Sequence, residues 1–169
     1  ILTSHYRSPL NYSDVHLQNA KGALTTLYTA LRCIEVSDEG IPDSDAYAQR
    51  FHTAMHDDFS TPEALAVLFE VAREVNKQRD SDPDKARYLA TLLRSLAGML
   101  GLLERNPDEY LRGGASGDLQ DADIEALIEK RTTARQNKDW AESDRIRDEL
   151  QAQGVILEDG AGGTTWRRE

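Results

Sequence analysis

Apolar residues recur at spacings of three and four through the first two-thirds of the chain, and this period constrains the fold more than any other feature. The first such stretch, residues 17–34, follows Ser13 and Asp14, which are residue types that commonly begin a helix. The apolar faces are broad enough for each helix to pack against two neighbours. We therefore predict an antiparallel helical bundle over residues 14–112.

The most clearly marked helix of this bundle lies in the stretch DFSTPEALAVLFEVAREVNK. Ser60 or Thr61 can cap its first turn, and Pro62 has a φ angle that suits the same turn. Glu63 lies near the positive end of the helix dipole, where a carboxylate is favourable. A further apolar face over residues 89–103 predicts the next helix.

A glycine-rich stretch, RGGASGD, then breaks the helical period without a large apolar residue to anchor it. It predicts a flexible linker over residues 113–120 and a separate domain over residues 121–169. Helical spacing returns over residues 121–135, with Ile124 and Ile128 on the inward face.

The rest of this domain contains a second helix and two short strands. The D-x-x-E pattern that begins at Asp139 is a capping box, and Gly154 suits the end of the helix that follows. The segments VILED and TTWRR flank a glycine-rich turn and predict a β-hairpin. The predicted fold class is mainly α: an antiparallel helical bundle followed by a small α+β domain, a helical hairpin plus a β-hairpin.

The charge and cysteine content limit the possible partners and compartment. The net charge of −10 is spread along the chain and disfavours bulk electrostatic binding of nucleic acid, so any such site must be local. No apolar run approaches the roughly 18 residues of a membrane span, and we expect no membrane contact. The single cysteine, Cys33, favours a reducing cytoplasm, and we expect an inert, half-buried thiol there.

The sequence contains no evident catalytic constellation. His52 and His56 have a spacing that can place two imidazoles on one metal, but a third ligand is needed, and a polar helix end is the simpler interpretation. The GAGG segment lies between predicted strands rather than at the start of a helix, so it is no phosphate-binding loop. We expect neither catalysis nor a bound cofactor or metal in this chain.

Trp140 lies among charged residues and is the strongest candidate for a functional side chain. At about 100° per residue, it lies roughly 120° from Ile146 and off the face that Ile146 and Leu150 define. It shares its own face with Asp144 and Arg147, and Arg135 approaches the same end of the helical hairpin.

An aromatic ring beside guanidinium and carboxylate groups can stack an unpaired base and read its edge. The alternative is that the ring packs across the helical hairpin or under the β-hairpin. The spacing of residues alone does not decide between these two interpretations of Trp140.

Three segments, HYRSPLNYS, DDFSTPEALAVLFEVAREVN and the run from LIEKRTTARQNKDW to GTTWRRE, together resemble the C-terminal portion of bacterial cysteinyl-tRNA synthetases. The resemblance covers essentially the whole chain. It implies a tail of the tRNA-contacting segment over residues 1–13, a DALR-like bundle over 14–112 and an anticodon-binding domain over 121–169. The catalytic domain, with its ATP and zinc sites, would lie in a part of the protein that this chain lacks.

The resemblance also implies roles for particular residues. Arg135, Trp140, Asp144 and Asp159 match family positions that recognise the anticodon GCA, with Trp140 as a stacking surface. Arg147, on the same helix face, is expected to contact a phosphate or base. The implied partner is cysteine tRNA, and the implied state is a cytoplasmic monomer.

Two alternatives remain at this point. One is a related cysteine ligase that acts on an amino sugar; such relatives lack an anticodon-binding domain, which disfavours this alternative. The other is a helical protein-interaction module in which Trp140 is a hot spot for a protein partner.

Overall fold

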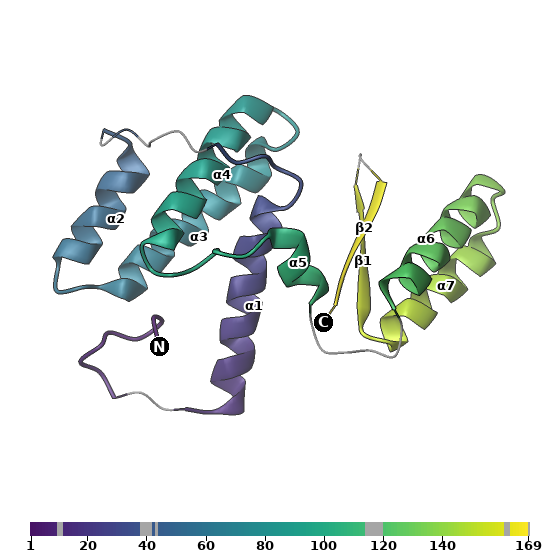
Figure 1. Cartoon of the computed structure of the whole chain (residues 1–169), viewed down its shortest axis with the longest axis horizontal. Coiled ribbons are helices and arrows are strands. Elements are labelled where there is room, and N and C mark those ends of the chain that lie inside the picture. The colour runs from purple at the N-terminus through teal and green to yellow at the C-terminus, as the bar shows by residue number, and fades with distance from the viewer. Residues whose placement is uncertain (10–11, 38–41, 43, 114–119, 161–162, 169) are drawn as a thin grey trace. The chain divides into compact units, whose positions relative to one another are not determined.

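The computed structural model describes residues 1–9, 12–37, 42, 44–113, 120–160 and 163–168 (Figure 1). The chain divides into two compact units, Ile1–Pro107 and Asp108–Glu169. This division falls a few residues before the predicted linker, most of which lies outside the described residues.

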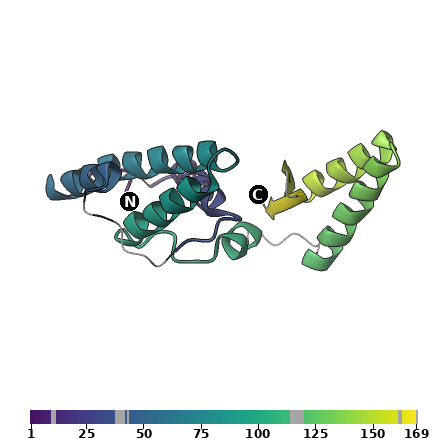
Figure 2. The same ribbon diagram turned by 90° about the horizontal axis from the view of Figure 1, so that it is seen from above.

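The first unit consists of helices, as the apolar period predicts (Figures 1 and 2). They are α1 (Asp14–Leu31), α2 (Ala46–His56), α3 (Thr61–Gln78) and α4 (Pro83–Gly98). Helix α3 is central, since it packs against α1, α2 and α4. Phe51, Leu68 and Leu93 are among the fully buried side chains of its core.

The helix starts follow the local signals in the sequence. The Ser13 side chain accepts a hydrogen bond from the His16 amide at the start of α1 (3.3 Å). Helix α3 begins after Ser60 with Pro62 in its first turn, although the Ser60 side chain makes no capping bond there. The apolar face of α1 is buried only in its later turns, because Leu17 is exposed and Leu27 and Leu31 are buried.

The end of α1 is held by the arginine that directly follows α3. Arg79, which follows α3, donates to the carbonyl oxygens of Arg32 (2.7 Å), Ala30 (3.0 Å) and Thr29 (3.3 Å). Helix α1 has no basic residue in its own last turn, so Arg79 supplies the positive charge that its carbonyl end favours.

Cys33 lies just after this end, with a φ of +59°, and its side chain is exposed. The expectation of a half-buried thiol is therefore wrong. The apolar period predicts a helix up to residue 34, whereas the helix ends at Leu31 and Cys33 lies beyond it in a left-handed conformation.

The second unit contains the predicted small α+β domain and also most of α5, which lies in the stretch 14–112 that the sequence assigns to the bundle. Its elements are α5 (Pro107–Arg112), α6 (Asp121–Gln136), α7 (Trp140–Ala152), β1 (Val155–Gly160) and β2 (Gly163–Arg168). The two strands pair antiparallel, with Leu157 opposite Trp166 and Asp159 opposite Thr164. The fold class is thus confirmed: mainly α, with one small β-hairpin.

Trp166 is the centre of the second unit's thin core and is only 1% exposed. Its indole N–H donates to Glu125 of α6 (3.0 Å), while the Arg112 and Arg168 guanidinium groups lie 5.1 and 5.6 Å from its ring centroid. The ring packs with the apolar side chains of α6, α7 and β1. They are Ile124, Ile128, Ile146, Leu150 and Val155.

Candidate nucleic-acid interface

The turn between α6 and α7 positions Trp140. Helix α6 ends in a Schellman motif: Lys138, at φ +60°, donates to the Arg135 carbonyl (3.1 Å), and Asp139 donates to the Ala134 carbonyl (2.9 Å). The Asp139 side chain then accepts from the Glu142 amide (3.1 Å) and begins α7. Trp140 is consequently the first residue of that helix.

Only half of the predicted capping box forms. The Asp139 amide is already bonded to Ala134, and the Glu142 carboxylate pairs with Arg145 instead (2.7 Å). The turn is nevertheless fixed on both sides by backbone hydrogen bonds, so the position of the Trp140 backbone is well determined by local sequence.

The Trp140 side chain is 60% exposed, whereas the second tryptophan, Trp166, is buried. The alternative in which Trp140 packs inside the domain is therefore wrong. Trp140 lines an open pocket of about 520 Å³ between α6, the start of α7, the end of β1 and the start of β2. The residues that line this pocket are Thr132, Arg135, Gln136, Trp140, Asp159, Gly160, Gly163 and Thr164.

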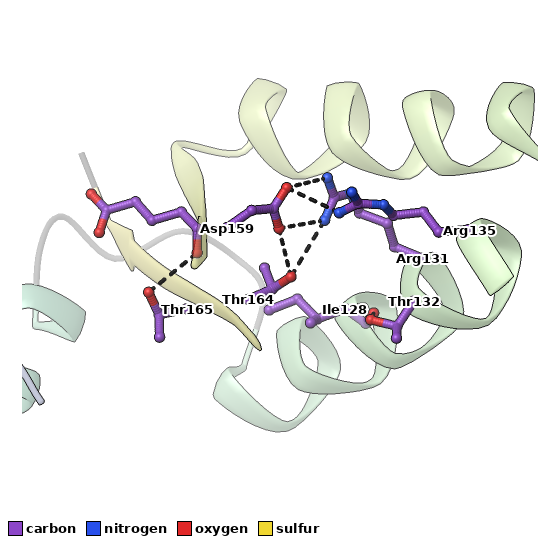
Figure 3. Close-up of polar contacts among 8 residues, drawn as sticks. Ile128, Arg131, Thr132, Arg135, Asp159, Thr164 and Thr165 are labelled. Carbon is purple, nitrogen blue, oxygen red and sulfur yellow. Dashed lines mark hydrogen bonds and ion pairs between the residues drawn. The ribbon is translucent and has the colours of Figure 1, made fainter. Parts of the chain in front are cut away.

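Asp159 is bonded on both carboxylate oxygens (Figure 3). Oδ1 accepts from Arg131 Nη1 (3.0 Å) and from the Thr164 hydroxyl (2.6 Å). Oδ2 accepts from Arg131 Nη2 (2.9 Å) and from Arg135 Nη1 (3.1 Å). The carboxylate thereby joins α6 to both strands of the hairpin.

The same contacts keep this cluster ionised. Hydrogen bonds from Arg131 and then from Thr164 hold the pKa of Asp159 well below its usual range, and they outweigh the effect of partial burial. The Asp159 carboxylate in turn raises the pKa of Arg131. At neutral pH the Asp159 carboxylate is therefore ionised and bonded to two guanidinium groups, of which the Arg135 group lines the pocket and the Arg131 group is buried behind it.

Three of the five residues singled out from the sequence share this pocket: Arg135, Trp140 and Asp159. Asp144 and Arg147 are exposed on α7 and are not among the described residues that line it. Asp144 is nevertheless close enough to raise the pKa of Arg131 through its charge.

Sequence reasoning missed Arg131 and Thr164 as members of the site. Arg131 lies one helical turn before Arg135, so its place on the same face of α6 was visible. The role of Thr164 depends on the hairpin register, which places it directly opposite Asp159. The sequence of the two strands indicates that Thr164 faces Asp159 only when the register of their pairing is known.

Other candidate sites gain no support from the geometry. Over the described residues, no three His, Cys, Asp or Glu side chains are grouped so that they could hold a metal ion, and His52 and His56 belong to no such group. None of the described helices is both long and apolar enough to cross a membrane.

The first residues of the chain are tied to the turn after α2. The Tyr6 hydroxyl donates to Asp58 (2.8 Å), Arg7 forms an ion pair with the same carboxylate (3.1 Å), and the His5 ring contacts the Asp58 carbonyl oxygen (3.1 Å). These contacts lie within the first unit.

Comparison with known proteins identifies both units. Residues 50–104 match the family model of the DALR domain, and residues 118–167 match that of the cysteinyl-tRNA ligase anticodon binding domain. The first match falls within the unit Ile1–Pro107, and the second falls within the unit Asp108–Glu169.

Whole-chain relatives agree with these matches. The chain is 60% identical over 168 residues to the cysteine–tRNA ligase of Thioalkalivibrio sulfidiphilus and 59% identical over 170 residues to that of Chromobacterium violaceum. Each alignment covers 99% of this chain and 36% of the relative, so the chain spans about a third of their length. The chain therefore belongs to the cysteine–tRNA ligase family, of which it contains the DALR and anticodon-binding domains.

Proposed function

We propose that this chain is the tRNA-binding region of a cysteine–tRNA ligase and that it recognises the anticodon of cysteine tRNA. The observation that carries the proposal is the exposed ring of Trp140 in one pocket with Arg135 and Asp159. The ring offers a face on which an unpaired base can stack. The guanidinium and carboxylate groups are suited to the acceptors and donors on the base edge.

Asp144 and Arg147 extend the proposed interface along α7. Both are exposed and lie on the same helix as Trp140, so they are available to the nucleotides that flank the stacked base. An exposed carboxylate at this position can accept hydrogen bonds from base amino or imino groups, and the arginine can contact a phosphate.

The acidic net charge is compatible with this function because recognition of loop bases acts at short range. Stacking and edge hydrogen bonds depend on the local arrangement of a few groups, whereas net charge governs long-range attraction. We expect weak, salt-sensitive binding by this chain alone, since much of the tRNA would lie against other parts of a longer ligase.

The chain's contribution to catalysis would be positioning. Energy from anticodon contacts favours the tRNA orientation that brings its 3′ end to a catalytic domain, where ATP-dependent cysteinylation takes place in the cytoplasm. The ATP site and any zinc site would belong to that domain. The chain itself would act as a monomer without a cofactor of its own.

A titration with short RNA hairpins tests the proposal. The chain is mixed with an anticodon stem–loop that carries GCA and with matched stem–loops in which each anticodon base is changed in turn. The exposed Trp140 should give the main change in tryptophan fluorescence, since Trp166 is buried. We expect tighter binding of the GCA hairpin.

Two variants serve as controls. Trp140→Phe retains an aromatic face and should preserve part of the affinity that stacking contributes, whereas Trp140→Ala should lose that contribution. Equal binding of all the stem–loops by the wild-type chain would contradict anticodon recognition. Tight binding of a protein, with no preference among these RNAs, would favour the interaction-module alternative instead.

A further inference from the structure

The donors around Asp159 differ in how freely they can move. A carboxylate offers about four acceptor positions, and Arg131, Thr164 and Arg135 fill them with four hydrogen bonds. Asp159 therefore has no acceptor left for a base. If it is to contact RNA, one of these donors must leave.

Arg131 is the donor least able to leave. Its side chain is only 6% exposed, and both terminal nitrogens bond to Asp159. Its Nε atom is buried and has no hydrogen-bond partner among the described residues, so the two bonds to Asp159 make up most of the hydrogen bonds that this guanidinium group forms with them. Separation of the two would leave a buried cation without this counter-charge, which costs more than separation of the exposed Arg135 from the same carboxylate.

Thr164 is also constrained. It lies directly opposite Asp159 in the hairpin register, so its hydroxyl is held near Oδ1 by the pairing of the two strands. Arg131 Nη1 also approaches the Thr164 hydroxyl (3.5 Å), and the three groups form one connected set (Figure 3).

Arg135 differs from both. Its side chain is 46% exposed, it makes a single hydrogen bond to Asp159, and it lines the pocket beside Trp140. An exposed ion pair of this kind contributes little stability and can be exchanged at small cost.

We propose that Arg131 and Thr164 are positioning residues that hold Asp159 at the pocket wall, and that Arg135 is the donor that moves from Asp159 to the RNA. The inference rests on the proposed anticodon recognition. When a base enters, an amino or imino group of the base takes the acceptor position that Arg135 vacates. Arg135 then donates to an acceptor of the RNA, so the number of hydrogen bonds is preserved.

Variants of Thr164 provide the cleanest test, because they leave the Arg131–Asp159 ion pair intact. Thr164→Val keeps the shape of the side chain and removes the hydroxyl, and Thr164→Ser restores it. Thr165→Val is the matched control, since Thr165 is the next residue of β2 and its hydroxyl contacts the Glu158 carbonyl oxygen rather than Asp159.

Affinity is measured in the full 169-residue chain for the GCA stem–loop and for the stem–loops with single base changes. Thr164→Val should weaken binding of the GCA hairpin roughly tenfold, as expected for the loss of a hydrogen bond to a charged group. The variant should no longer distinguish the base at one anticodon position. Its affinity for the stem–loop changed at that position should equal that of the wild-type chain. Thr164→Ser and Thr165→Val should behave like the wild type.

Arg131→Lys tests the other positioning residue, since lysine keeps the charge and loses the two-pronged geometry. Its effect on RNA affinity should vanish in an Asp159→Asn background, because a residue that acts through Asp159 cannot act without it. In nuclear magnetic resonance spectra, the Arg135 side-chain N–H signals should shift on addition of the GCA hairpin, and those of Arg131 should stay in place.

Several results would overturn the inference. For Thr164→Val, these results are an unchanged affinity for the GCA hairpin or an equal loss of affinity for every hairpin. For Arg131→Lys, the result is a loss of affinity that adds fully to the loss caused by Asp159→Asn. In the spectra, the result is that the Arg135 side-chain signals do not shift when the chain is saturated with the GCA hairpin. If the proposed function is wrong, the wild-type chain itself will bind all the hairpins equally. That result would contradict both the proposed function and this inference, and it differs from the results above, in which the wild-type chain still discriminates.

Discussion

Arg131 and Asp159 lie 28 residues apart in the sequence and form a two-pronged ion pair, with N–O distances of 3.0 and 2.9 Å. Six residues earlier on α6, Glu125 accepts a hydrogen bond from Trp166 of β2. The β-hairpin is thus attached to α6 at two levels, by a buried indole at one and by a carboxylate at the other. The second attachment forms a wall of the Trp140 pocket.

This attachment makes the stability of the second unit sensitive to acid. The pKa of Asp159 is lower in the folded chain than in the unfolded chain, so folding is favoured by ionisation of this group. Its contribution is fully present above the unfolded pKa of about 4 and is lost as the pH falls through the lower folded pKa. Melting curves between neutral and acid pH, followed by Trp166 fluorescence, should show this loss.

Asp159→Asn is the control for that measurement. At neutral pH it should destabilise the second unit by ~1 kcal/mol, a value kept low because the Asp159 side chain is 44% exposed. The difference from the wild type should shrink as the pH falls below about 4. A difference that stays constant down to the acid transition would contradict the assignment of the pH dependence to Asp159.

The two tryptophans should respond oppositely to replacement by alanine. Trp140→Ala should change the free energy of unfolding by no more than about 0.5 kcal/mol, since the ring is exposed. It should weaken binding of the GCA stem–loop roughly 5- to 150-fold, which is the range for loss of one stacked base.

Trp166→Ala should instead destabilise the second unit by about 3–5 kcal/mol, because it empties the centre of a thin core. Thermal melting of both variants beside an RNA titration separates the two roles. A large loss of stability in Trp140→Ala would show that this ring, too, supports the fold.

Local sequence patterns predicted the elements of this fold better than the contacts between them. The Ser13 cap, the start of α7 after Asp139 and the turn at Gly154 lie where short-range preferences place them. These features depend on a few neighbouring residues, so they can be identified from the sequence.

The candidate site depended on information that is not local. The exposure of Trp140 follows from helix geometry and was foreseen as one of two possibilities. The burial of Arg131 and its pairing with Asp159 require the β-hairpin to lie against α6 in a particular register. No spacing within one element specifies that register, so the sequence showed Arg131 on the same helix face as Arg135 but not the pairing of Arg131 and Thr164 with Asp159.

A long-range cap in the first unit gives a third prediction. Arg79→Met should destabilise this unit by about 2 kcal/mol, because it removes charged hydrogen bonds to three carbonyl groups at the end of α1. Chemical denaturation followed by circular dichroism measures the change. Arg87→Met, at an exposed arginine of α4, is the matched control and should be close to neutral. Equal effects of the two substitutions would argue against the capping role.

Cys33 gives the last prediction, because it is exposed and has a left-handed backbone conformation at the end of α1. Glycine adopts this conformation without the steric cost that a side chain carries. Cys33→Gly should therefore stabilise the first unit by about 0.5–1 kcal/mol, whereas Cys33→Val, which is branched at Cβ, should destabilise it. In the wild type, a disulfide reagent should modify the thiol stoichiometrically without denaturant. A thiol that reacts only after unfolding, or a Gly variant less stable than the wild type, would contradict the geometry of this turn.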